Sequence, residues 1–148
     1  DCKINNLLFD AASDQAVCVV DLDTVMPGTL LADFGELVRT ATCRAAEDER
    51  DLTLVDFDAA RFDALARGYA AGLAGLPTEA ERAALWLGGP WMAVENAARF
   101  LADHLDGDRY FPARRPEHNL QRTRAQLHLA EALWREREAL RRGVARAC

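Results

Sequence analysis

Residues 1–24 read DCKINNLLFDAASDQAVCVVDLDT. Two short apolar runs within this stretch, residues 6–9 and residues 16–20, are separated by the turn-forming residues 10–14. Apolar runs of this length with a turn signal between them predict a β-hairpin. Such a hairpin brings the residues before its first strand to the same edge as Asp21, which follows its second strand.

The rest of the chain carries helical signals in place of strand signals. We expect helices over these stretches: from an N-cap at Asp33 onward, over residues 59–75, from a capping box at Thr78 and Glu81 to an interruption at residues 88–90, over residues 91–105, and over residues 119–146. Cys18 falls in the second apolar run and is expected to be buried. The predicted fold class is therefore mostly α with a small β-hairpin.

The composition fits a single domain. With 148 residues, of which 50% are hydrophobic, the chain can bury one core. Its net charge of −6 gives no general attraction to nucleic acid or to an anionic membrane, because basic patches drive such binding. The four cysteines have no C-x-x-C spacing, and the sequence shows neither a signal-peptide pattern nor an apolar run of membrane-spanning length. We therefore expect a cytoplasmic protein that binds neither nucleic acid nor membrane.

The hairpin carries the residues with the clearest chemical signal. Four residues separate Asp1 from Asn6, and Asp21 follows a short apolar strand. Asp-x-x-x-x-Asn is the second half of a kinase catalytic loop, in which the Asp accepts the proton of the attacking hydroxyl and the Asn reaches a magnesium ion. Magnesium prefers one or two carboxylates together with phosphate oxygens and water. The spacing therefore predicts phosphoryl transfer, with Asp1 as the catalytic residue and with Asn6 and Asp21 as metal ligands.

A second class of enzyme also fits Asp21-Leu22-Asp23-Thr24. Phosphatases of the haloacid dehalogenase type begin with a strand that ends in this pattern, where the first Asp is the nucleophile and the second is the acid and base. That fold needs strands and helices in alternation. Because this chain shows only helical signals after its hairpin, the kinase interpretation is favoured.

Four segments extend the kinase interpretation along the chain: DCKINNLLFD, VCVVDLDTVMPGTLLADFGELVR, RFLADHLDGDRYF and RPEHNLQRTRAQ. In this order they resemble the C-terminal lobe of the N-acetylhexosamine 1-kinases, a family of the aminoglycoside phosphotransferase superfamily. The resemblance implies the C-lobe of the kinase-like fold over residues 1–148. Residues 1–28 would form the catalytic loop and metal-binding hairpin, and residues 29–148 a helical subdomain. It also implies ATP as phosphoryl donor, Mg2+ as cofactor, and the anomeric hydroxyl of an N-acetylhexosamine-like sugar as acceptor.

Individual roles follow from the same resemblance. It implies that Arg99 and Tyr110 line the acceptor pocket and that Asp23 contacts the sugar. From the residues alone, Arg99 would pair with an acidic side chain and Tyr110 would fill the core, so both interpretations stay open. Asp33-Phe34-Gly35 spells a metal-binding triplet of kinases, but it stands twelve residues after Asp21 and opens a helix. Asp33 is therefore expected to be an N-cap.

The chain departs from the family at its front. In the family a His and a Gly precede the catalytic Asp, and both are absent from this sequence. The nucleotide-binding N-lobe is absent as well. We therefore expect this chain to be part of a longer kinase, to be inactive alone, and to form a homodimer through the surface that a missing lobe exposes. Two alternatives remain: a kinase for an aminoglycoside or another small alcohol, which would need a strongly acidic site, and a catalytically silent lobe.

Overall fold

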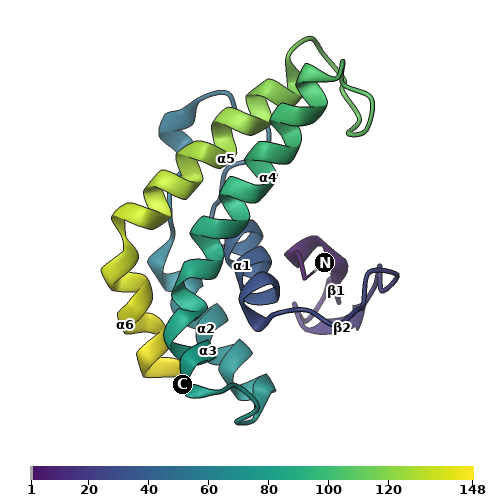
Figure 1. The fold of residues 1–148 in the computed structure, drawn as a ribbon. Coiled ribbons are helices and arrows are strands. Elements are labelled where there is room, and N and C mark those ends of the chain that lie inside the picture. The colour runs from purple at the N-terminus through teal and green to yellow at the C-terminus, as the bar shows by residue number, and fades with distance from the viewer. Residues whose placement is uncertain (1) are drawn as a thin grey trace.

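A computed structural model describes residues 2–148 as a group of packed helices with a β-hairpin at its side (Figure 1). The hairpin pairs strand β1 (Leu7–Phe9) with strand β2 (Ala16–Val19) in antiparallel orientation. Its turn is held by Asp10, whose carboxylate accepts a hydrogen bond from the backbone N–H group of Ser13 at 2.9 Å. The predicted hairpin is confirmed, and so is the predicted fold class.

Helices make up the rest of the described chain. In order they are α1 (Leu30–Ala41), α2 (Ala59–Leu73), α3 (Glu79–Ala84), α4 (Gly88–Leu105), α5 (His118–Arg135) and α6 (Arg137–Ala147), with short 3-10 turns at Ile4–Asn6, Leu52–Leu54 and Leu85–Leu87. Within residues 2–148, no helix has the length and apolar character needed to cross a lipid bilayer.

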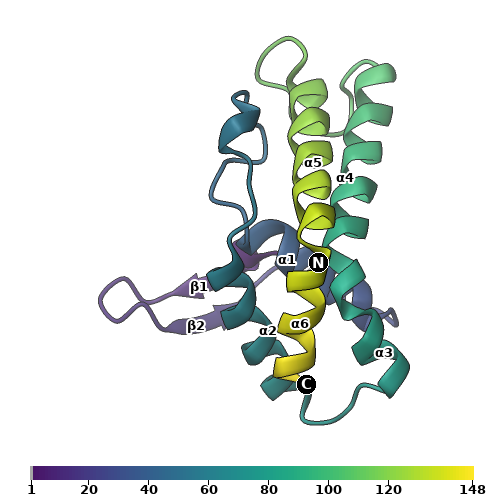
Figure 2. The same ribbon diagram turned by 90° about the vertical axis from the view of Figure 1, so that its left-hand side faces the viewer.

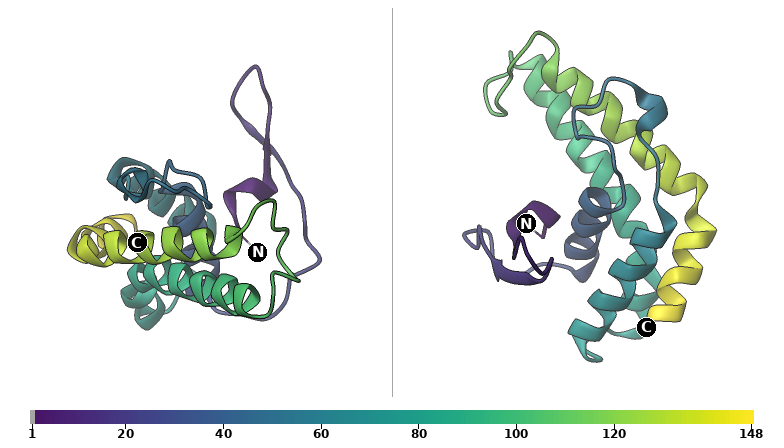
Figure 3. Two further views of the ribbon diagram at one scale, coloured as in Figure 1. Left: turned by 90° about the horizontal axis from the view of Figure 1, so that it is seen from above. Right: turned by 180° about the vertical axis from the view of Figure 1, so that it is seen from behind.

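Two long helices form the frame of the molecule. Helices α4 and α5 lie side by side, and α6 continues from α5 after a bend (Figures 1 and 3). Helix α1 packs against α4, while α2 packs against α6. The side chains between these helices form one apolar core, whose most deeply buried members include Phe34, Phe62, Leu85, Leu129, Leu133 and Leu140.

Two helix starts differ in part from the predictions. Helix α1 begins three residues before Asp33, and Thr29 is its N-cap, because the Thr29 hydroxyl accepts a hydrogen bond from the N–H group of Ala32. Asp33 instead lies in the first turn, where its negative charge suits the positive end of the helix. The capping box of Thr78 and Glu81 at the start of α3 is confirmed.

One predicted helix break is misplaced, and one break was not predicted. The break before α4 lies at Leu85–Leu87, and the helix already runs through Pro90. Proline is tolerated there because a residue in the first turn needs no hydrogen bond from its own N–H group. The predicted continuous helix over residues 119–146 divides at Glu136, so that α5 packs on α4 while α6 turns toward α2.

The hairpin projects away from the helices, as the side view shows (Figure 2). All four residues of β2 are exposed, so the expected burial of Cys18 is wrong. The segment before β1 contacts the helical body, since the N–H group of Ile4 donates to the Thr40 hydroxyl of α1 at 3.0 Å. This contact fixes the base of the hairpin against α1.

Helices α1 and α4 meet at two glycines. A Cβ atom on Gly35 would lie 2.5 Å from the carbonyl carbon of Gly88 and 2.7 Å from the Met92 side chain. A Cβ atom on Gly88 would lie 2.5 Å from the carbonyl oxygen of Leu31. The two backbones therefore touch directly, and this contact sets the distance between the helices.

Candidate active site

The structure brings Asn6 and Asp21 to the same end of the hairpin. The backbone carbonyl of Asn6 accepts a hydrogen bond from the N–H group of Val20 at 2.9 Å, which places Asn6 beside the residue that precedes Asp21. Asp21 has a φ of 62°, a left-handed conformation that turns the chain sharply as it leaves β2. Asp1, the predicted catalytic residue, lies outside the described residues.

Asn6 and Asp21 offer donors that suit magnesium. The Asp21 carboxylate is about half exposed and lies 3.5 Å from the Lys3 ammonium group. Among residues 2–148, no group of three or more His, Cys, Asp or Glu side chains is arranged to hold a metal ion. Magnesium does not require such a group, because one or two protein carboxylates with phosphate and water oxygens complete its shell. A carboxylate and an amide at one hairpin edge fit this ion.

A cavity of about 870 Å³ opens beside the hairpin. Its walls come from the residues before β1, from α1 and the segment after it, from α4 and the loop after it, and from α5. Arg99 and Tyr110 both line this cavity, as do Lys3 and Thr24 from the hairpin region. Asn6, Asp21 and Asp23 themselves do not. The structure therefore places the two predicted pocket residues together and sets Asp23, which is exposed, outside the walls.

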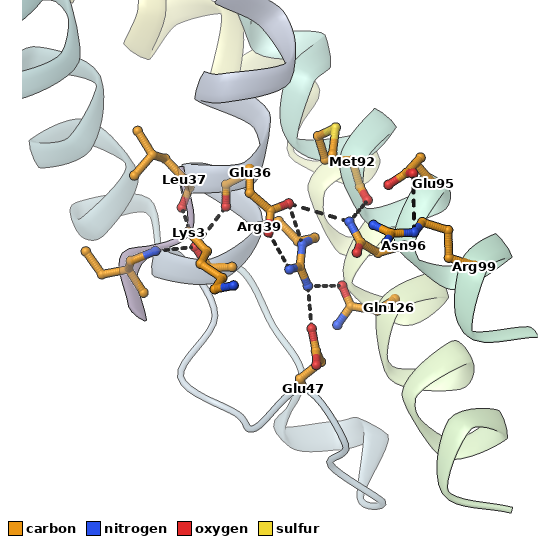
Figure 4. Close-up of polar contacts among 12 residues, drawn as sticks. Lys3, Glu36, Leu37, Arg39, Glu47, Met92, Glu95, Asn96, Arg99 and Gln126 are labelled. Atoms are coloured by element: carbon orange, nitrogen blue, oxygen red, sulfur yellow. Dashed lines mark hydrogen bonds and ion pairs between the residues drawn. The ribbon is translucent and has the colours of Figure 1, made fainter. Parts of the chain in front are cut away.

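The cavity floor contains a buried arginine with several partners (Figure 4). Arg39 of α1 donates two hydrogen bonds to the Glu36 carboxylate, at 2.9 and 2.6 Å. Its Nη1 atom also donates to Glu47 at 2.8 Å and to Gln126 of α5 at 3.1 Å. Burial acts to lower the pKa of Arg39, but Glu36 and then Glu47 outweigh it and raise the pKa above its ordinary value. We call these four residues the Arg39 cluster.

The segment that carries Glu47 is fixed to α5 by its next residue. Asp48 accepts hydrogen bonds from Nε2 of the buried His118 at 2.8 Å and from Arg115 at 3.0 Å. Nδ1 of His118 accepts from the N–H group of Arg114, so Nε2 carries the imidazole proton. The hydrogen bond from His118 is the main reason that the pKa of Asp48 lies below its ordinary value. These contacts hold Glu47 against the cavity.

Arg99 and Tyr110 both pack against the Phe111 ring. The Arg99 guanidinium lies 5.4 Å from the centre of the Phe111 ring, and the Tyr110 ring packs edge-on against Phe111 at 4.7 Å. Arg99 also approaches Glu95 of its own helix at 3.8 Å, as expected from the residues alone. Tyr110 is 74% exposed, so the expectation that it fills the core is wrong. Its phenol remains open to the cavity.

Asp103 organises the loop that presents Tyr110. Its buried carboxylate accepts hydrogen bonds from the backbone N–H groups of Arg109, Tyr110 and Phe111, at 2.8 to 2.9 Å, and from the Asn119 side chain at 2.9 Å. Burial acts to raise the pKa of Asp103, but the backbone donors outweigh it and hold the pKa below its ordinary value. One carboxylate therefore holds three consecutive backbone N–H groups of the loop.

We expect Asp103→Asn to loosen this loop. An amide has one acceptor oxygen, and its NH2 group would face backbone donors, so hydrogen bonds to the loop are lost. Amide hydrogen exchange at residues 109–111 should accelerate about tenfold or more. In the unaltered protein the order should persist at mildly acidic pH, because the lowered pKa keeps Asp103 ionised until the pH falls below the ordinary aspartate range. Asp106→Asn, in the same loop but 68% exposed, is the control and should leave the exchange unchanged.

Two titratable side chains, Cys2 and the partly buried Tyr69, feel the charge of Asp33 in the first turn of α1. Burial and then the charge of Asp33 raise the pKa of the Cys2 thiol. Burial and the same carboxylate raise the pKa of Tyr69 to about 12, and its hydroxyl donates to the Leu30 carbonyl at 3.3 Å. Asp33 thus acts electrostatically on its neighbours at the start of the helix.

Sequence reasoning missed Glu36, Arg39 and Asp103. One signal was available for the first two, since an acid and a base three residues apart interrupt an otherwise apolar helix face. Asp103 gave no comparable signal, because its partners are backbone groups of a loop.

A family model described as the phosphotransferase enzyme family matches residues 1–86. The match spans the hairpin and helices α1 to α3, including Asn6, Asp21 and the α1 part of the Arg39 cluster. Arg99, Asp103 and Tyr110 lie beyond it, so the far wall of the cavity is described by the structure alone.

Proposed function

Because the chain belongs to the phosphotransferase enzyme family, within the aminoglycoside phosphotransferase superfamily, we propose that it transfers the γ-phosphoryl group of ATP to the anomeric hydroxyl of an N-acetylhexosamine-like sugar. Family membership establishes a phosphotransferase with a mostly helical, kinase-like C-lobe. The observation that supports the finer proposal is the cavity, which runs from the hairpin region to Arg99 and Tyr110. The phosphatase alternative at Asp21 lacks its parallel sheet within residues 2–148.

In this proposal the hairpin supplies the reacting groups. Asn6 and Asp21 would hold Mg2+, which when bound neutralises charge on the phosphates of the nucleotide. Asp1 would accept the proton of the attacking sugar hydroxyl. The backbone hydrogen bond between Asn6 and Val20 keeps the two ligand-bearing residues at one end of the hairpin. Positioning of this kind is the main contribution of a protein to phosphoryl transfer.

In this proposal the acceptor is recognised by the cavity wall that contains Arg99, Tyr110 and Phe111. Arg99 can donate to hydroxyl or acetamide oxygens, and the Tyr110 phenol can both donate and accept. Aromatic rings suit the apolar face of a sugar ring, and Phe111 supports both residues from behind. In the same proposal Asp23, which lies outside the cavity walls, meets the sugar at the cavity mouth.

The charge of the cavity favours a neutral acceptor over a cationic one. Its described walls include four acidic side chains, Asp33, Glu36, Glu47 and Glu95, and four basic side chains, Lys3, Arg39, Arg99 and Arg122. A kinase for an aminoglycoside needs a clear excess of acidic groups, which the described walls do not have. This balance supports the sugar over the aminoglycoside.

Transfer should be measured on the full protein that carries this chain. With ATP, Mg2+ and N-acetylglucosamine, phosphorus NMR should detect a sugar 1-phosphate. The methyl glycoside of the same sugar is the matched control, because its anomeric oxygen is blocked and should give no product. Phosphate on another hydroxyl, or equal transfer to an aminoglycoside, would contradict the proposed acceptor. Absence of transfer to every alcohol would favour the catalytically silent lobe.

A further inference from the structure

The Arg39 cluster places a cation between two carboxylates at the cavity floor. The side chains of Arg39 and Glu36 are only 6% and 10% exposed, whereas Glu47 is 42% exposed. Glu36 receives two donors from the guanidinium, and Glu47 receives one. Asn96 of α4 adds a long contact to the Glu36 carboxylate at 3.5 Å. Both carboxylates therefore face the same buried positive charge.

This arrangement controls the field that an acceptor meets. Charges act over longer distances in a partly enclosed cavity than in open water, because less solvent screens them. Without Arg39, Glu36 and Glu47 would give the floor a charge of −2 and attract ammonium groups. With Arg39 in place the cluster carries −1, and the other charged side chains of the described walls sum to +1. An ammonium group then gains no net attraction that would offset its loss of water.

We propose that the Arg39 cluster sets the charge selectivity of the acceptor site, so that neutral hydroxylated rings bind in preference to rings that carry an ammonium group. This inference rests on the proposed function, since it concerns the acceptor of that reaction. It assigns a specificity role to Arg39, which has nearly all of its donors occupied by protein groups. Arg39 acts through the charge that it cancels, without touching the acceptor.

Gln126→Glu tests the proposal while keeping Arg39. The change is isosteric, it adds one carboxylate 3.1 Å from the Arg39 guanidinium, and Gln126 lines the cavity. Gln121→Glu is the matched control on the same helix: Gln121 also accepts from an arginine, Arg115 at 2.7 Å, but it does not line the cavity. Arg39→Gln is avoided because it would leave Glu36 buried without its partner.

Binding of glucose and glucosamine should be measured by calorimetry on the full protein, at a pH where the amine is protonated. These sugars differ by one hydroxyl replaced by one ammonium group. Gln126→Glu should raise the ratio of glucosamine affinity to glucose affinity about tenfold. Glu47→Gln, at a partly exposed position that tolerates change, should move the ratio in the opposite direction, and Gln121→Glu should leave it unchanged.

The outcomes separate this inference from the proposed function. If the sugars bind and the ratio stays the same in Gln126→Glu and Glu47→Gln, charge selectivity does not come from this cluster and the inference is overturned. If the unaltered protein binds no sugar, the proposed function fails and the inference fails with it. If Gln126→Glu does not fold, the Glu47→Gln ratio decides alone.

Discussion

Gly35→Ala should lower the free energy of unfolding by about 3 kcal/mol or more, the upper range for overpacking a tight contact. The added methyl group would meet the carbonyl carbon of Gly88 at 2.5 Å, and backbone atoms cannot rotate away as a side chain can. Helices α1 and α4 would have to separate. Because α1 carries Glu36 and Arg39, the cavity floor would shift with it. Denaturant unfolding followed by circular dichroism measures the change.

Gly68→Ala provides the matched control. Gly68 lies inside α2, and nothing approaches the position of its Cβ atom within 4 Å. Alanine in an open helical position stabilises by roughly 0.5–1 kcal/mol, so this variant should become more stable. Opposite signs for the same chemical change would identify the glycine contact as the cause. A stabilised Gly35→Ala variant would show that the helices do not depend on this contact.

Arg39→Met should cost about 3–5 kcal/mol of stability, the range for removing one partner of a buried ion pair. Methionine fills much of the arginine volume but leaves the Glu36 carboxylate, 10% exposed, without a cation. Thermal unfolding followed by circular dichroism measures the loss.

Arg44→Met is the comparison for an exposed arginine. Arg44 also donates two hydrogen bonds to one carboxylate, that of Asp58, but its side chain is 74% exposed. Exposed ion pairs contribute little, so this variant should unfold close to the unaltered protein. Equal losses of stability for Arg39→Met and Arg44→Met would show that burial does not explain how much the Arg39 ion pair contributes to the free energy of unfolding.

Local patterns in the sequence predicted much of the fold. The two apolar runs around residues 10–14 are sufficient for the hairpin, and Thr78 with Glu81 predicts the start of α3, because both signals act over a few residues. The hairpin also predicts that Asn6 and Asp21 lie at the same end, since strand pairing fixes which residues share an end.

Features that depend on tertiary packing were not predictable in this way. No Gly or Pro marks the division at Glu136, which arises because α5 and α6 pack on different helices. Trp86 is 8% exposed, whereas Trp134 is 52% exposed although the centres of the two rings lie 5.9 Å apart. The Arg39 cluster joins α1, the segment after it and α5, so that Arg39 and its partner Gln126 lie 87 positions apart in sequence.

The hairpin is stabilised by far fewer contacts than the cavity walls. A two-stranded ribbon is marginally stable by itself, and here its strands are exposed while its base contacts α1. The cavity, in contrast, is built on long packed helices, a buried ion cluster and a loop fixed by Asp103. The groups that the proposal assigns to chemistry and those that it assigns to recognition therefore differ in resistance to heat. On warming, we expect the proposed transfer activity to be lost at a lower temperature than sugar binding.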